Sequence, residues 1–176
     1  MSRTVGHIAA VVLVLALGAP TISGAQASQT TTDTYTWSGE FVSIDAAAGT
    51  ISVKARVVYP DALLELKQFK AGEKVWVVWS GVRDYSDGVR QLRRFQANEK
   101  ANDIFTLPAE LVSPEPQNQY ITIRIKVPAS SVAELKANNP GQWVTVTSRH
   151  RPATDAEAII AVKPYVSQMN TNTNTH

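Results

Sequence analysis

Hydrophobic and polar residues alternate along much of the chain, as they do in strands that bury one face. Within residues 50–56 the apolar positions Ile51, Val53 and Ala55 are separated by polar ones, which is the period of two expected of a half-buried strand. Residues 75–79 are instead almost continuously apolar, which is typical of a strand covered on both faces. The pattern therefore predicts a mainly β protein.

Two short segments have helical spacing instead. In the first, Leu63 and Leu66 fall on one side of a helix that Pro60 can start, because the N–H that proline lacks has no helical partner there. In the second, Ser131 and Glu134 have the spacing of a capping box, in which each side chain binds a free backbone N–H. Two short helices are therefore expected.

The same pattern occurs twice along the chain. Residues 40–43, Glu-Phe-Val-Ser, return as residues 110–113, Glu-Leu-Val-Ser, and the alternating segment 50–54 returns as 120–124. Each copy runs through a strand, a turn, a second strand, a short helix and a further strand. A duplicated β unit is therefore predicted.

This unit resembles the OB-like small barrels of secreted and periplasmic bacterial proteins. The resemblance rests on the x-Val-Ser-x-turn-Ile-x-Val-Lys hairpin and on the later run Lys-Ala-Gly-Glu-Lys-Val-Trp-Val-Val. It covers residues 37–97 as repeat 1 and 107–167 as repeat 2. It implies tandem duplicated OB-like small β-barrels, mainly β with two short helices. The alternative is one interleaved barrel or sandwich, and closure removes exposed strand edges in either case.

The N-terminal residues have the features of a secretory signal peptide. Arg3 precedes an apolar run over residues 8–17 that is too short to span a bilayer, and Ala25-Gln26-Ala27 fits a cleavage site. We therefore expect residues 1–27 to be removed and the protein to be exported, periplasmic or extracellular, without a stable membrane span. Three further segments are expected to lie outside the repeats: a disordered leader (28–36), a linker (98–106) and a disordered tail (168–176).

Composition and charge narrow the possible functions. The chain carries 17 basic and 15 acidic residues, a net charge of +2, so nucleic acid is an unlikely partner. It contains no cysteine, which removes disulfides and thiolate chemistry. His150 stands between Arg149 and Arg151, whose charges disfavour a cation. We therefore expect no metal, no cofactor and no catalytic residues, and interpret the protein as non-enzymatic.

Aromatic and basic residues of repeat 1 supply the candidate ligand face. Trp76 and Trp79 lie three positions apart on one strand, so they point to opposite faces, and we expect one in the core and the other exposed. An exposed aromatic beside guanidinium groups is typical of a ligand groove on an OB-type barrel. The predicted ligand-binding residues are Trp79, Tyr85, Arg83, Arg90 and Arg94. The alternative is that both Trp side chains fill the core and the Arg residues form a solvated face.

Two functions remain open at this stage. The first is a binding module whose ligand is an oligosaccharide or an anionic polymer. The second is a structural or assembly protein of the cell envelope that has protein partners.

Overall fold

A computed structural model describes residues 33–82, 84–96, 99–101 and 103–166 of the chain. These residues form eight strands: β1 (Thr34–Asp45), β2 (Thr50–Arg56), β3 (Lys74–Val82), β4 (Tyr85–Arg94), β5 (Thr106–Glu115), β6 (Tyr120–Lys126), β7 (Trp143–Arg149) and β8 (Ile159–Pro164). They also form three short helices: α1 (Pro60–Leu66), α2 (Ala129–Leu135) and α3 (Asp155–Ala158). The mainly β prediction is confirmed, and α3 is a helix that was not predicted.

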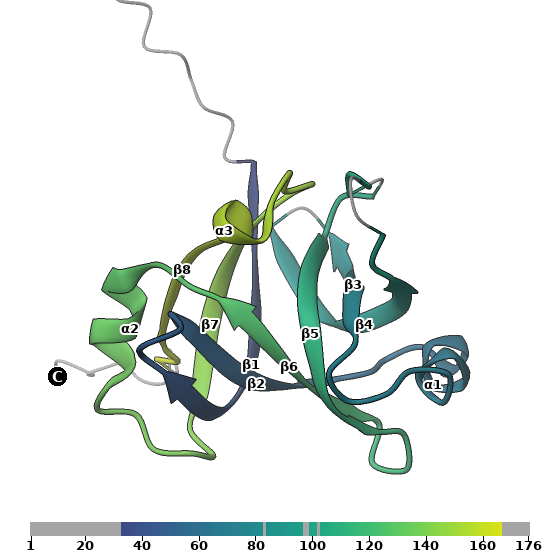
Figure 1. The fold of residues 1–176 in the computed structure, drawn as a ribbon, viewed down its shortest axis with the longest axis horizontal. Coiled ribbons are helices and arrows are strands. Elements are labelled where there is room, and N and C mark those ends of the chain that lie inside the picture. The colour runs from purple at the N-terminus through teal and green to yellow at the C-terminus, as the bar shows by residue number, and fades with distance from the viewer. Residues whose placement is uncertain (1–32, 83, 97–98, 102, 167–176) are drawn as a thin grey trace, which may run out of the picture. The chain divides into compact units, whose positions relative to one another are not determined.

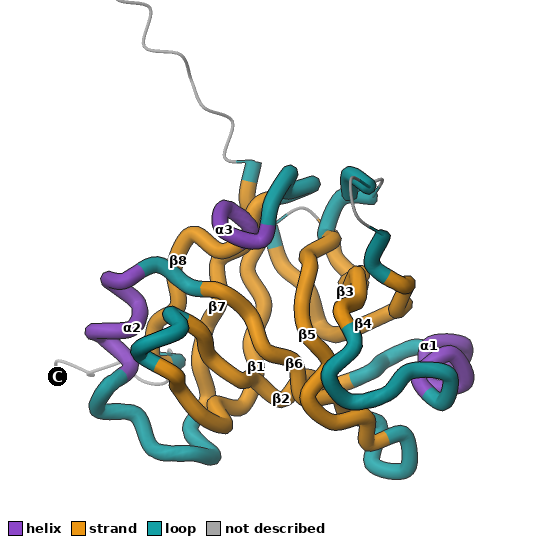
Figure 2. Tube along the Cα trace, viewed as in Figure 1, coloured by secondary structure: helices purple, strands orange, loops and turns teal. Residues whose placement is uncertain are grey.

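Six of the strands close into a barrel in the order β1, β2, β6, β5, β3, β4 and back to β1. The two ends of the ring meet on β1, whose C-terminal part pairs with β2 while Thr36 and Trp37 pair with β4 in parallel. Strands β7 and β8 extend the sheet beyond β1. Figures 1 and 2 show α1 and α2 on opposite sides of this barrel. The small-barrel prediction is confirmed.

Both halves of the chain contribute to this single barrel, so the structure does not have two closed barrels in tandem. Strand β3 of the first half pairs with β5 of the second, and β7 of the second half pairs with β1 of the first. The register is the same in both cases, because Lys74 lies opposite Glu110 as Trp143 lies opposite Glu40. The strands that follow α1 and α2 thus each pair with a strand of the other half, which corresponds to the single-barrel alternative.

A stacked pair of tryptophans lies at the centre of the core. The rings of Trp37 and Trp79 have centroids 4.2 Å apart, and the indole N–H of Trp37 donates to the hydroxyl of Ser148 at 2.8 Å. Burying an indole N–H without a partner is costly, so Ser148 fixes the orientation of the Trp37 ring. Aliphatic side chains of β2 to β8, with Tyr35 and Phe41 of β1, complete the core.

Close backbone contacts explain why a turn-like pair lies inside a strand. Asp87 and Gly88 form a pair common in hairpin turns, yet both continue β4. A Cβ atom on Gly88 would lie 2.5 Å from Cγ1 of Val58 and 2.9 Å from the carbonyl oxygen of Arg56. Glycine is therefore needed here for close approach of the backbones rather than for a turn.

The expected boundaries of repeat 1 need correction. The predicted leader over residues 28–36 is too long, because β1 begins at Thr34, opposite Arg149 of β7. The predicted linker over 98–106 is packed in part, since Phe105 within it is buried. The predicted signal peptide (1–27) and tail (168–176) lie outside the described residues. Within the described part of the chain, no helix is long and apolar enough to cross a membrane.

The predicted capping box at Ser131 is also wrong. Helix α2 begins after Pro128, and no side chain caps its first turn. The buried hydroxyl of Ser131 instead accepts the backbone N–H of Val162 in β8 at 2.9 Å. A capping box does occur at Thr154 and Glu157, where it starts α3. Ser131 therefore links α2 to the outer strand of the sheet.

Candidate functional site

Three half-exposed aromatic side chains surround one hollow of about 390 Å³ on the outer surface of the sheet. The exposed fractions are 58% for Tyr85, 50% for Trp143 and 52% for Tyr165, and Ser38 completes the lining. Rings of this size are usually buried to a greater extent. Their grouping around a concave surface is typical of a ligand site.

Backbone hydrogen bonds fix the main-chain positions of the three aromatic residues. The N–H of Tyr165 donates to the carbonyl oxygen of Trp143 at 2.9 Å, which makes these residues neighbours on β7 and the segment after β8. Tyr85 opens β4 opposite Thr36, whose N–H donates to the carbonyl oxygen of Asp84 at 2.6 Å. Tyr85 and Trp143 therefore project from paired strands, and Tyr165 projects from a segment that is hydrogen-bonded to β7.

Hydroxyl side chains lie between the rings. Thr36 pairs with Thr147 across β1 and β7, and Ser38 pairs with Thr145. All four are partly exposed and alternate along their strands with buried residues, so they share the outer face. We call this surface the aromatic–hydroxyl face; its residues are Tyr85, Trp143, Tyr165, Thr36, Ser38, Thr145 and Thr147.

Trp79, the first of the predicted ligand residues, lies in the core. It is 1% exposed and belongs to the same buried cluster as Val75 and Val77, whereas Trp76 points to the opposite face of β3. Trp76 is equally buried, its ring lies beside that of Phe95, and its indole N–H donates to Glu99 at 3.2 Å. The prediction of opposite faces is confirmed, and the expectation that one of these Trp side chains is exposed is wrong.

Arg90 and Arg94, the two predicted arginines that the structure describes, do not line the hollow of Tyr85. Arg90 forms an ion pair with Asp103 beside a different hollow of about 280 Å³, which Trp79 also lines. Arg94 lies 3.2 Å from Glu73 and donates a second hydrogen bond to the carbonyl oxygen of Gln68. Arg83 lies outside the described residues. Of the four predicted residues that the structure describes, Tyr85 is the one that lines the aromatic hollow.

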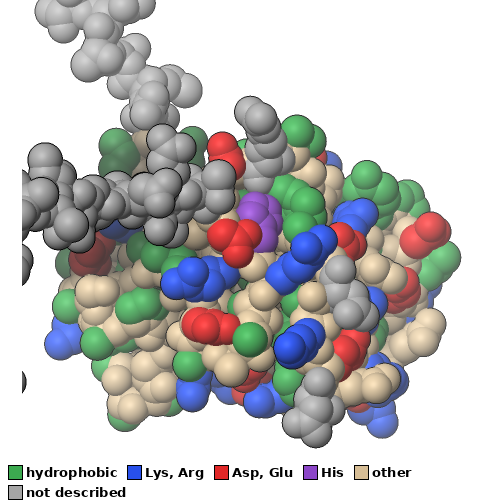
Figure 3. All heavy atoms as spheres, turned by 90° about the horizontal axis from the view of Figure 1, so that it is seen from above, with side chains coloured by type: hydrophobic (Ala, Val, Ile, Leu, Met, Phe, Trp, Pro, Cys, Tyr) green, Lys and Arg blue, Asp and Glu red, His purple; other side chains and the backbone are tan. Residues whose placement is uncertain are grey.

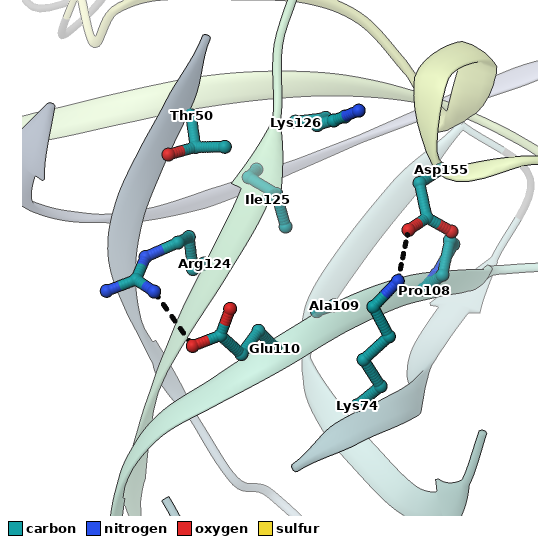
Figure 4. Close-up of a pocket in the computed structure, with 9 residues that line it drawn as sticks. All are labelled: Thr50, Lys74, Pro108, Ala109, Glu110, Arg124, Ile125, Lys126 and Asp155. Atoms are coloured by element: carbon teal, nitrogen blue, oxygen red, sulfur yellow. Dashed lines mark hydrogen bonds and ion pairs between the residues drawn. The ribbon is translucent and has the colours of Figure 1, made fainter. Parts of the chain in front are cut away.

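A second surface hollow, shown in Figure 4, is lined by charges of both signs. Lys74 points toward Asp155 at 3.3 Å, and Arg124 points toward Glu110 at 2.8 Å. The volume is about 140 Å³, smaller than the ~300–1,000 Å³ of ordinary ligand pockets. Because both carboxylates are paired and the space is small, we assign no ligand to this hollow.

Basic and acidic side chains are mixed on the surface seen from above in Figure 3. Among the described residues visible in this view, no extended patch of one sign occurs. A bulk polyanion binder would be expected to have such a patch.

His150 takes part in an aromatic cluster. Its ring stacks on Tyr35 with centroids 5.0 Å apart, and its Nδ1 accepts the backbone N–H of Phe105 at 3.3 Å. Burial raises the pKa of the Tyr35 phenol far above its usual range, although Ser148 beside it opposes this shift. In the part of the chain that the structure describes, no three His, Cys, Asp or Glu side chains gather as metal ligands.

Comparisons of the chain with protein-family models, with curated proteins and with solved structures found no match. The fold and the site together define a small closed β-barrel whose sheet extends beyond the barrel and carries the aromatic hollow on its outer face.

Proposed function

We propose that the protein is a non-enzymatic binding module and that its ligand lies on the aromatic–hydroxyl face. The observation that carries this proposal is the exposure of Tyr85, Trp143 and Tyr165 around one hollow. Aromatic rings combine a large apolar surface with few rotatable bonds, so they bind a flat partner at a small cost in entropy. The proposed ligand face keeps Tyr85 of β4 but not Trp79, Arg90 or Arg94, and its other residues come from β1, β7 and the segment after β8.

Tryptophan fluorescence offers a direct test, because the four Trp side chains differ sharply in exposure. Trp37, Trp76 and Trp79 are at most 1% exposed, whereas Trp143 is 50% exposed. Iodide is therefore expected to quench the emission of Trp143 and to leave the other three nearly unaffected. Replacing this residue, Trp143→Phe, should remove the quenchable fraction.

The binding experiment measures this quenching in the presence of oligosaccharides, anionic polymers and short single-stranded DNA. A ligand of the proposed site protects Trp143 from iodide, and Tyr165→Ala weakens that protection. Tyr59→Ala is the matched control, because Tyr59 is 49% exposed but lines the hollow beside Arg90. If no member of these panels protects Trp143, the proposed function is wrong and a structural role in the envelope takes its place.

Export of the protein to the periplasm or the medium is a separate proposal. It is supported by Arg3, the apolar run over residues 8–17 and the Ala25-Gln26-Ala27 sequence. N-terminal sequencing of the protein from cell fractions tests it. An exported chain that starts at Ser28 is the expected result, and a cytoplasmic chain that keeps Met1 would contradict it.

A further inference from the structure

We infer that the ligand of the aromatic–hydroxyl face is an uncharged oligosaccharide that lies diagonally across β4, β1 and β7. This inference rests on the proposed function and narrows its ligand class. It is carried by three properties of the face: the positions of its rings, the hydroxyl row between them and the balance of charge around it.

The rings occupy two opposite corners of the face. Tyr85 lies beside Thr36 at one end of β1, and Trp143 lies beside Glu40 four positions further along, on the other side of the strand. With strands about 4.8 Å apart and about 3.3 Å per residue, the two Cα atoms are roughly 16 Å apart. This span is longer than one sugar ring, so a ligand that touches both corners is a chain of several units.

The space between the corners is lined with hydroxyl groups. Thr36 and Ser38 of β1 and Thr145 and Thr147 of β7 form this row, and each hydroxyl can both donate and accept a hydrogen bond. A sugar ring has an apolar face of C–H groups and a rim of hydroxyls. The aromatic rings at the corners can pack against the apolar faces of the sugars, and the hydroxyl row can form hydrogen bonds with their hydroxyl groups.

Charge around the face favours an uncharged ligand over an anionic one. Glu40 lies beside Trp143, and Lys163 lies beside Thr145, so the neighbouring charges include both signs. Arg149 follows beyond Thr147, opposite Thr34. Among the residues that the structure describes, the hollow itself is lined by Ser38 and the three aromatic side chains, with no Asp, Glu, Lys or Arg.

Binding of matched hexasaccharides tests this inference. Cellohexaose and maltohexaose are the uncharged probes, hexagalacturonate is the anionic probe of equal length, and hexathymidylate represents nucleic acid. Protection of Trp143 from iodide and titration calorimetry report binding at low and high NaCl. We expect an uncharged hexasaccharide to bind with nearly the same affinity at both, because salt screens only charged contacts.

Variants separate the hydroxyl row from the rings. Thr145→Val keeps the shape and strand preference of the side chain but removes its hydroxyl, and should weaken binding roughly three- to tenfold. Thr50→Val is the matched control, because Thr50 is a partly exposed strand residue that lines the charged hollow instead. Arg90→Ala should leave affinity unchanged, since this guanidinium is paired with Asp103.

The possible failures are distinguishable. Tight binding of hexagalacturonate or hexathymidylate that weakens as NaCl rises would overturn the uncharged-ligand inference while leaving the aromatic–hydroxyl face as the binding site. Unchanged affinity in Thr145→Val, with loss of binding in Trp143→Ala, would overturn the role of the hydroxyl row. Failure of every probe to protect Trp143 would reject the proposed function together with this inference.

Discussion

Replacing Ser131 by alanine should destabilise the protein far more than the same change at its neighbour Ser130. Ser131 is 2% exposed, and its hydroxyl accepts the N–H of Val162 on the side of β8 that faces away from β7. Without this acceptor, a buried backbone N–H has no partner, which costs about 1–3 kcal/mol. Ser130 is exposed in the same helical turn, so Ser130→Ala should change stability by less than about 0.5 kcal/mol.

Thermal and urea unfolding measure the difference between these variants. The expected loss corresponds to a fall in melting temperature of roughly 3–10 °C for a domain of this size. Amide hydrogen exchange gives a local test, since the N–H of Val162 should exchange faster in Ser131→Ala. If the Ser131 and Ser130 variants unfold at the same urea concentration, the hydrogen bond to Val162 does not stabilise the outer strand and the reasoning is refuted.

Three further changes test the barrel and the site. Gly39→Ala places a Cβ 2.4 Å from Cγ1 of Val53 and 2.9 Å from the carbonyl oxygen of Lys54, and should cost about 1–3 kcal/mol in urea unfolding; an unchanged midpoint would contradict the close approach. The hydrogen bond between Lys54 and Glu115 (2.9 Å) lowers the pKa of Glu115 and raises that of Lys54. The small contribution of this pair to the free energy of unfolding is therefore present at neutral pH. It is lost in acid as Glu115 becomes protonated, and lost in base as Lys54 becomes deprotonated. Glu115→Gln should therefore be slightly less stable than the wild type at pH 7 and equal to it well below the ordinary Glu pKa of about 4.3, and a difference that persists in acid would argue against the pair. Trp143→Ala should fold with a urea midpoint close to that of the wild type, because the side chain is half exposed, and a large loss of stability would mean that the ring is structural.

Much of the fold is predictable because strand periodicity is local information. The alternation of Ile51, Val53 and Ala55 indicates β2, and its echo in residues 120–124 indicates β6. Which strands pair is a non-local property, however. The apolar run from Val75 to Trp79 predicts a buried strand but does not indicate that β3 pairs with β5 of the other half. The sequence therefore does not distinguish two barrels from one.

The candidate site was harder to predict for the same reason. An aromatic residue next to arginines favours a ligand face, so the local sequence around Trp79 points to the surface. Trp37, whose ring stacks on Trp79 in the core, is far away in the sequence. Trp143 and Thr145 did carry a usable signal, since alternation with buried Val144 places both on the outer face of β7. Tyr85 and Tyr165 join them only through strand pairing, which periodicity does not reveal.

The two halves share one strand register, but only the second half places an aromatic residue at the position where the hollow forms. Lys74 opposite Glu110 and Trp143 opposite Glu40 are corresponding positions, so the same backbone pairing presents different side chains at each. At the first position Lys74 forms an ion pair with Asp155, so the surface there carries paired charges. At the second, an indole takes the place of the ammonium group and lies half exposed beside Tyr165. Since the two strand pairs keep the same register with either side chain there, strand pairing alone does not require the exposed Trp143, which favours a role in binding.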